Sequence, residues 1–215
     1  MSKPRILLAD DHTLVLEGFK KLLDEQNQVI GSVSDGRALL DAAKQLRPDV
    51  IVLDISMPKL NGLDAARRLR KIVPQARLIF VTVHADQDYV NQAFKAGASA
   101  YLLKRSAGSE LSQAVEAVMN GDYYVTSLIA KDLVQSAIAE PEANAGGQDR
   151  LPVRQREILQ LVAEGLTLKE IASTLGLSPK TVEYHKSKLM EQLGLHTTAE
   201  LTKYALAHGL TPSSE

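Results

Sequence analysis

The chain of 215 residues carries 25 lysine and arginine side chains against 26 aspartate and glutamate side chains, which gives a net charge of −1. This length favours two compact domains, and the charge balance excludes a protein that coats nucleic acid or anionic lipid through bulk charge. The absence of cysteine excludes a disulfide framework and fits a reducing compartment. Apolar runs are too short to span a membrane and the first residues lack a signal-peptide core, so we expect a cytoplasmic protein without membrane contact.

Short apolar runs alternate with amphipathic stretches in the N-terminal half. Continuous apolar character is typical of parallel strands that are covered on both faces. The alternation therefore predicts an α/β domain with a doubly wound, five-stranded parallel sheet. The expected strands are 6–9, 29–33, 50–53, 78–81 and 101–103, and the expected helices lie near 12–24, 35–46, 61–72, 86–96 and 108–119.

A stretch without large apolar residues separates this domain from the rest of the chain. Residues 140–150 contain a proline and a Gly-Gly pair, which is typical of a flexible linker. The expected domains are residues 1–122, a linker helix (near 125–138) with a flexible linker over 123–150, and a small all-α domain over 151–215. Four helices are predicted in the last domain from capping signals at Thr167, Ser178 and Thr197, at 152–164, 168–175, 179–193 and 198–208.

Charged and hydroxyl side chains follow four of the predicted strands. Asp10 and Asp11 end the first, Asp54 the third, Thr82 the fourth and Lys104 the fifth. Each alone has an ordinary interpretation as a helix cap or a solvated side chain. The carboxyl ends of parallel strands form one edge, however, where open α/β sheets hold their ligands. The set therefore predicts a site at this edge.

The chemistry of this site follows from its charges. Three close carboxylates repel one another unless a cation is present, and Mg²⁺ (or another divalent ion) binds carboxylates, waters and a phosphate. A carboxylate beside such an ion can attack a phosphoryl group. Thr82 and Lys104 would then stabilise the transferred group through a hydrogen bond and a positive charge.

The ordered set resembles response-regulator receiver domains across residues 4–120. The matching segments are Asp10-Asp11, Asp54 to Gly62, Thr82, and Tyr101 to Lys104. The resemblance implies a flavodoxin-like receiver fold in which Asp54 accepts a phosphoryl group from a sensor histidine kinase.

The resemblance also implies roles for the neighbouring residues. Asp11, Asp54 and the Ser56 carbonyl would hold Mg²⁺, and Asp10 would act largely through a metal-bound water. Thr82 and Tyr101 look like a switch pair, in which Thr82 turns towards the phosphoryl charge and Tyr101 packs inward. His84 matches a position that tunes phosphate lifetime in the family, and a solvated loop histidine is an equally good interpretation.

The predicted helix 179–193 has an apolar stripe and a basic face. Residues 178–190 contain three lysines and one glutamate, within a domain of seven basic and seven acidic side chains. Such a face alone is usually only solvated. The surrounding pattern, however, resembles the LuxR-type helix-turn-helix over residues 151–210, notably in Lys169-Glu170-Ile171-Ala172 and Thr181-Val182-x-x-His185.

This second resemblance implies that helix 179–193 lies in the major groove of double-stranded DNA. Phosphate contacts are expected from Lys180, Thr181, Lys186 and Lys188, and base contacts from Glu183, Tyr184 and Ser187. Two positions depart from the family pattern: Leu168 replaces the usual asparagine and Pro152 the usual threonine, which weakens the inference of local backbone or phosphate contacts.

With so little net charge, one such domain should bind DNA weakly, so we expect a homodimer on a pseudo-palindrome. The last helix, with Leu201, Tyr204, Ala205 and His208 on one face, resembles the family's dimerisation helix, or these residues only complete the small core.

Two alternatives belong to other classes. An aspartate-nucleophile phosphatase would place one residue between two aspartates at the first strand end, whereas Asp10 and Asp11 are adjacent. A regulator that does not depend on phosphorylation would be free to lose the acid, hydroxyl and lysine set. The sequence therefore favours a transcription factor of the NarL/FixJ type, which is not an enzyme, over both.

Overall fold

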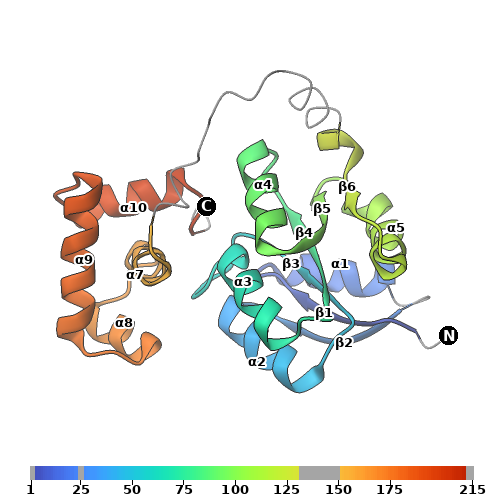
Figure 1. Cartoon of the computed structure of the whole chain (residues 1–215), viewed down its shortest axis with the longest axis horizontal. Coiled ribbons are helices and arrows are strands. Elements are labelled where there is room, and N and C mark those ends of the chain that lie inside the picture. Colours follow the sequence, from blue (N-terminus) through green and yellow to red (C-terminus); the bar gives the residue numbers. More distant parts are fainter. Residues whose placement is uncertain (1–2, 24–26, 131–150, 212–215) are drawn as a thin grey trace.

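The computed structural model describes residues 3–23, 27–130 and 151–211. No helix within these ranges is long and apolar enough to cross a membrane. An α/β domain and a helical domain lie side by side along the longest axis of the molecule (Figure 1).

The N-terminal domain is built on a parallel sheet in the order β2-β1-β3-β4-β5-β6. The predicted doubly wound parallel sheet is confirmed, but it has a sixth strand. β6 pairs with Ala100 and Tyr101 of β5. At two residues it is too short to give a periodic pattern in the sequence. The strands are β1 (Arg5–Ala9), β2 (Gln28–Val33), β3 (Val50–Leu53), β4 (Arg77–Thr82), β5 (Ala98–Leu103) and β6 (Tyr124–Val125).

Helices cover both faces of this sheet (Figure 1). Alternate strand residues point to opposite faces, so Leu7 and Ile51 join one apolar cluster while Ile6 and Val50 join the other. The first cluster includes α2 (Gly36–Leu46), α3 (Gly62–Ile72) and α4 (Gln87–Ala96), and the second includes α1 (Thr13–Leu23) and α5 (Ala107–Asn120). Continuous burial of β3 between the two clusters explains its unbroken apolar sequence.

Two glycines set the backbone near the sheet edges. A side chain at Gly62 would place its Cβ 2.0 Å from the Asp54 carbonyl oxygen, so glycine lets the start of α3 approach the end of β3. Gly97 ends α4 in the left-handed region with φ of 103°.

The C-terminal domain contains α7 (Val153–Ala163), α8 (Leu168–Leu175), α9 (Pro179–Leu193) and α10 (Thr198–Ala207). Capping boxes at Thr167 and Thr197 begin α8 and α10, and Ser178 caps α9 before Pro179. The four predicted helices are thus confirmed to within one residue at each end. Residues 127–130 are helical, whereas the rest of the predicted linker helix and the linker 140–150 lie outside the described residues.

Candidate functional site

Two buried carboxylates share one lysine at the carboxyl edge of the sheet. Asp10 and Asp54 follow β1 and β3 and are 1% and 3% exposed. The ammonium of Lys104, which follows β5, lies 2.7 Å from Asp10 Oδ2 and 2.8 Å from Asp54 Oδ2. The parallel topology therefore brings together residues that are up to 94 positions apart in the sequence.

The charges of this cluster support one another. Burial alone would lower the pKa of Lys104, but the charges and hydrogen bonds of Asp54 and Asp10 outweigh it, and the pKa lies above its usual value. The backbone N–H of Ile55 also donates to Asp54 Oδ1 at 2.6 Å. Asp54 is thus held by a cation and an amide at the mouth of the sheet.

A second carboxylate beside Asp10 gives the cluster the donors for a hard cation. Ligand atoms of Asp10, Asp11 and His12 lie within 4.8 Å of one another. His12 Nδ1 is 2.8 Å from Asp11 Oδ1 and 3.1 Å from Asp10 Oδ1. Oxygen donors suit Mg²⁺, so the residues fit the ion. His12 was not foreseen as a member of this group, although it directly follows the acid pair.

The buried side chains of Thr82 and Tyr101 lie with the half-buried His84 next to the acid cluster. The Thr82 side chain at the end of β4 is fully buried. Tyr101 already lies inward, and its hydroxyl donates to the His84 carbonyl at 2.9 Å. Burial raises the pKa of Tyr101, so the hydroxyl remains a neutral donor.

His84 links this group to the loop after Asp54. Its Nε2 lies 2.9 Å from Ser56 Oγ, and its ring stacks on Tyr89 of α4 at 4.2 Å. Burial lowers the pKa of His84, against the opposing charges of Asp54 and Asp86. His84 is thus a half-buried loop residue whose ring is packed against Tyr89.

Helix α9, which carries the expected recognition face, lies on the side of the C-terminal domain away from the N-terminal domain (Figure 1). Thr181 is half-buried there, and its hydroxyl lies 2.8 Å from Ser178 Oγ. Lys186 is also half-buried and donates to Thr198 Oγ1 at 2.9 Å, so its ammonium is partly engaged within the domain. The other expected DNA contacts are exposed: Lys180, Glu183, Tyr184, Ser187 and Lys188.

The face of α10 that was expected to dimerise is mostly used inside the domain. Leu201 and Ala205 are fully buried in the core with Ile158 and Leu189. Tyr204 is half-buried and stacks on His208 at 3.9 Å. Leu201 and Ala205 therefore complete the small core and do not line a dimer surface.

Helix α7 binds the N-terminal domain through a polar face that was not foreseen. Gln160 is fully buried, and its Nε2 donates to the Met57 carbonyl at 2.9 Å while its Oε1 accepts from the Asn61 N–H at 2.9 Å. The Lys59 N–H donates to Glu164 at 3.0 Å. These contacts join α7 to the loop that begins at Asp54.

Buried ion pairs extend this contact along α3. Two nitrogens of the Arg156 guanidinium donate to Asp64, Nη2 to Oδ1 at 2.8 Å and Nε to Oδ2 at 3.3 Å, and both residues are buried. Glu157 is 2% exposed and pairs with Arg68 of α3 and Arg154 of its own helix. Helical periodicity assigns polar residues such as Arg156 and Glu157 to a solvated face. A local sequence pattern also cannot show that Arg156 pairs with Asp64, which lies 92 residues earlier in the chain.

The fold and the site together define the class of protein. A doubly wound parallel sheet with a carboxylate and lysine cluster at its carboxyl edge, joined to a helix-turn-helix domain, is the architecture of a two-domain signalling regulator.

Comparison with known proteins identifies the family. Residues 6–116 match the response regulator receiver domain, and residues 149–205 match the bacterial regulatory proteins of the luxR family. The transcriptional regulatory protein MctR of Rhizobium johnstonii is 38% identical over 97% of this chain and 95% of its own length. The response regulator UvrY of Escherichia coli is 33% identical over 95% and 94%.

Solved structures agree with this assignment. RcsB of Salmonella typhimurium superposes with a TM-score of 0.66 at 26% identity, over 99% of this chain and 100% of that one. A structure of the RcsB–DNA complex superposes with a TM-score of 0.60 at 26% identity, over 96% and 99%. The chain belongs to the response regulators that join a receiver domain to a LuxR-type DNA-binding domain, and it is a DNA-binding transcription regulator.

Proposed function

We propose that this regulator accepts a phosphoryl group on Asp54 from a sensor histidine kinase. The P–N bond of a kinase phosphohistidine, whose other ring nitrogen carries a proton, breaks and a P–O bond to the Asp54 carboxylate forms, which leaves an acyl phosphate and a neutral imidazole. The observation that carries the proposal is the single ammonium of Lys104 between Asp54 and Asp10. The Lys104 ammonium can pair with the Asp54 carboxylate before transfer and with the phosphoryl oxygens after it.

The remaining site residues have supporting roles in this proposal. Asp10, Asp11, Asp54 and the Ser56 carbonyl would hold Mg²⁺. When bound, the ion would neutralise the phosphoryl oxygens. Asp10 would act largely through a metal-bound water, and Asp11 would supply the more exposed carboxylate. Thr82 donates a hydrogen bond to the transferred group, and Tyr101 completes the switch pair.

The DNA-binding domain in this proposal spans residues 151–215 and follows the receiver domain of 1–122 and the linker of 123–150. The exposed face of α9 enters the major groove of double-stranded DNA. Lys180, Thr181, Lys186 and Lys188 contact phosphates, and Lys186 must first release Thr198. Glu183, Tyr184 and Ser187 contact base edges. A homodimer doubles the number of protein–DNA contacts, because each copy binds one half-site. This binding takes place in the cytoplasm of the bacterial cell.

The contact with α7 supplies a route from Asp54 to DNA. Met57, Lys59 and Asn61 belong to the loop that begins at the phosphoryl acceptor, and Gln160 bonds two of them. A shift of this loop on phosphorylation weakens the docked arrangement. In the docked arrangement α9 lies away from the receiver domain (Figure 1), and most of its expected DNA contacts are exposed. Phosphorylation therefore controls DNA binding by releasing the whole domain from one fixed position, because the two half-sites of an operator lie about 34–36 Å apart.

The experiment is phosphoryl transfer to the full chain from a labelled small-molecule donor in the presence of Mg²⁺. We expect one stable label per chain in the wild type and none in Asp54→Ala, and we expect a chelator to suppress labelling. Full labelling of Asp54→Ala would refute the assignment of the acceptor. Multiple turnover of a generic phosphate ester would support the phosphatase alternative instead.

A further inference from the structure

A pocket lies at the opposite edge of the sheet from Asp54. Its volume is about 390 Å³, within the usual range of small-molecule sites. It opens where β4 and β5 begin, at Arg77 and Ala98, whereas Thr82 at the other end of β4 accepts a backbone hydrogen bond from Lys104. The phosphoryl chemistry proposed above therefore does not explain it.

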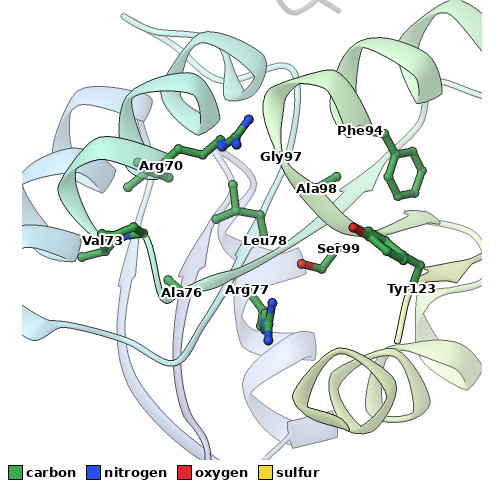
Figure 2. Close-up of a pocket in the computed structure, with 12 residues that line it drawn as sticks. Arg70, Val73, Ala76, Arg77, Leu78, Phe94, Gly97, Ala98, Ser99 and Tyr123 are labelled. Carbon is green, nitrogen blue, oxygen red and sulfur yellow. The ribbon is translucent and has the colours of Figure 1, made fainter. Parts of the chain in front are cut away.

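The pocket combines an apolar floor with two cationic groups (Figure 2). Leu78 and Ala98 are buried in its floor, and Arg70 and Arg77 extend from its walls on either side of Leu78. Neither guanidinium makes an ion pair or hydrogen bond with any residue in the described ranges. Unpaired guanidinium groups are fitted for carboxylate or phosphate oxygens.

Arg70 is positioned by its own packing. Gly97 has φ of 103°, and a Cβ at this residue would lie 2.5 Å from Arg70 Cδ. The missing side chain therefore leaves room for the aliphatic part of Arg70 to lie across the end of α4. This contact holds the guanidinium at the pocket and lowers the entropy cost of binding.

Two aromatic rings form the remaining wall. Phe94 and Tyr123 contact each other edge to face at 6.0 Å, and Tyr123 is 75% exposed. An exposed aromatic side chain beside an apolar floor favours a planar ring as the ligand. The Ser99 hydroxyl points into the same space (Figure 2).

We propose that this pocket binds a small aromatic molecule with a carboxylate or phosphate group. The ring lies against Leu78 and Tyr123, and the anionic group pairs with Arg70 and Arg77. The pocket is walled by α3 and α4, whose other ends reach the DNA-binding domain through Asp64 and Tyr89. A ligand here is thus placed to act as an effector of docking, and the proposal is independent of the chemistry at Asp54.

The test is a titration of the isotope-labelled full chain, followed by NMR of the backbone amides. Phenyl phosphate and benzoate are the probes, and inorganic phosphate and benzyl alcohol are the matched controls for the anion and the ring. We expect saturable shifts at Gly97, Ala98 and Ser99 with millimolar or tighter affinity for a probe that carries both groups, and at least tenfold weaker binding of each control.

Variants distinguish binding at this pocket from general attraction of an anion to positively charged side chains. Arg70→Gln with Arg77→Gln should weaken binding of phenyl phosphate at least tenfold, while Lys71→Gln, an exposed lysine on the same helix end, should leave it within twofold. Tyr123→Ala should weaken phenyl phosphate more than inorganic phosphate. The proposal is overturned if neither probe gives saturable shifts up to about 10 mM, if Lys71→Gln weakens binding as much as the arginine variants, or if inorganic phosphate binds as tightly as phenyl phosphate.

Discussion

Replacement of Lys104 by methionine is expected to abolish the response to phosphoryl donors. The substitution keeps the aliphatic volume but removes the ammonium that lies 2.7 Å from Asp10 and 2.8 Å from Asp54. Loss of one well-placed electrostatic group costs roughly 10²–10³ in rate. Initial rates of Asp54 labelling should therefore fall at least about 100-fold.

The same substitution should also destabilise the receiver domain. It leaves two carboxylates that are 1% and 3% exposed without their common cation. Breaking a buried ion pair costs about 3–5 kcal/mol, and we expect a loss at the low end of this range, because Lys104 is partly exposed and Mg²⁺ can restore part of the charge balance. Denaturant unfolding with and without Mg²⁺ measures this effect. Arg105→Met removes a neighbouring exposed cation and is the control; an equal loss in both variants would contradict the role of Lys104.

The second large effect is expected at the contact between the domains. Arg156→Met leaves the buried carboxylate of Asp64 with Arg67 as its remaining ion-pair partner. Removing one partner of a buried pair costs about 3 kcal/mol or more, which shifts the ratio of docked to undocked molecules at least about 100-fold. The double variant Arg156→Met with Asp64→Asn should lose less than the sum of the single variants, because the carboxylate that Arg156 compensates is then absent as well.

The absence of cysteine makes this measurement direct. Gln45→Cys and Glu191→Cys place one label at an exposed position in each domain. We expect a narrow distribution of distances between the labels in the background protein and a broad one after Arg156→Met. Lys169→Met is a matched control on α8, and a broad distribution in that variant as well would count against a specific contact.

Sequence reasoning was accurate where the signals are local. Thr167, Ser178 and Thr197 begin their helices with their own side chains, so the C-terminal helices could be placed to within one residue. The alternation of apolar runs and helices also predicted the parallel sheet, and the topology then brought Asp10, Asp54 and Lys104 together. The two-residue strand β6 was not predicted, because its formation depends on pairing with β5.

The contact between the domains could not be predicted in this way. Arg156, Glu157 and Gln160 are polar side chains that a periodic pattern assigns to solvent, yet all three are buried. Their partners in the receiver domain are about 90–100 residues away and become visible only in three dimensions. The engagement of Lys186 with Thr198 is of the same kind, because it depends on how α9 and α10 pack.

Whether phosphorylation of Asp54 frees the DNA-binding domain is measured by the affinity of the full chain for a DNA fragment that it protects in a genomic footprint. Affinity is measured with and without acetyl phosphate and Mg²⁺, for wild type, Asp54→Asn and Arg156→Met. We expect the donor to tighten binding at least about tenfold in the wild type and to have no effect in Asp54→Asn, and we expect Arg156→Met to bind tightly without the donor. Equal affinity of the wild type in both conditions, with labelling of Asp54 verified, would show that phosphorylation does not control DNA binding.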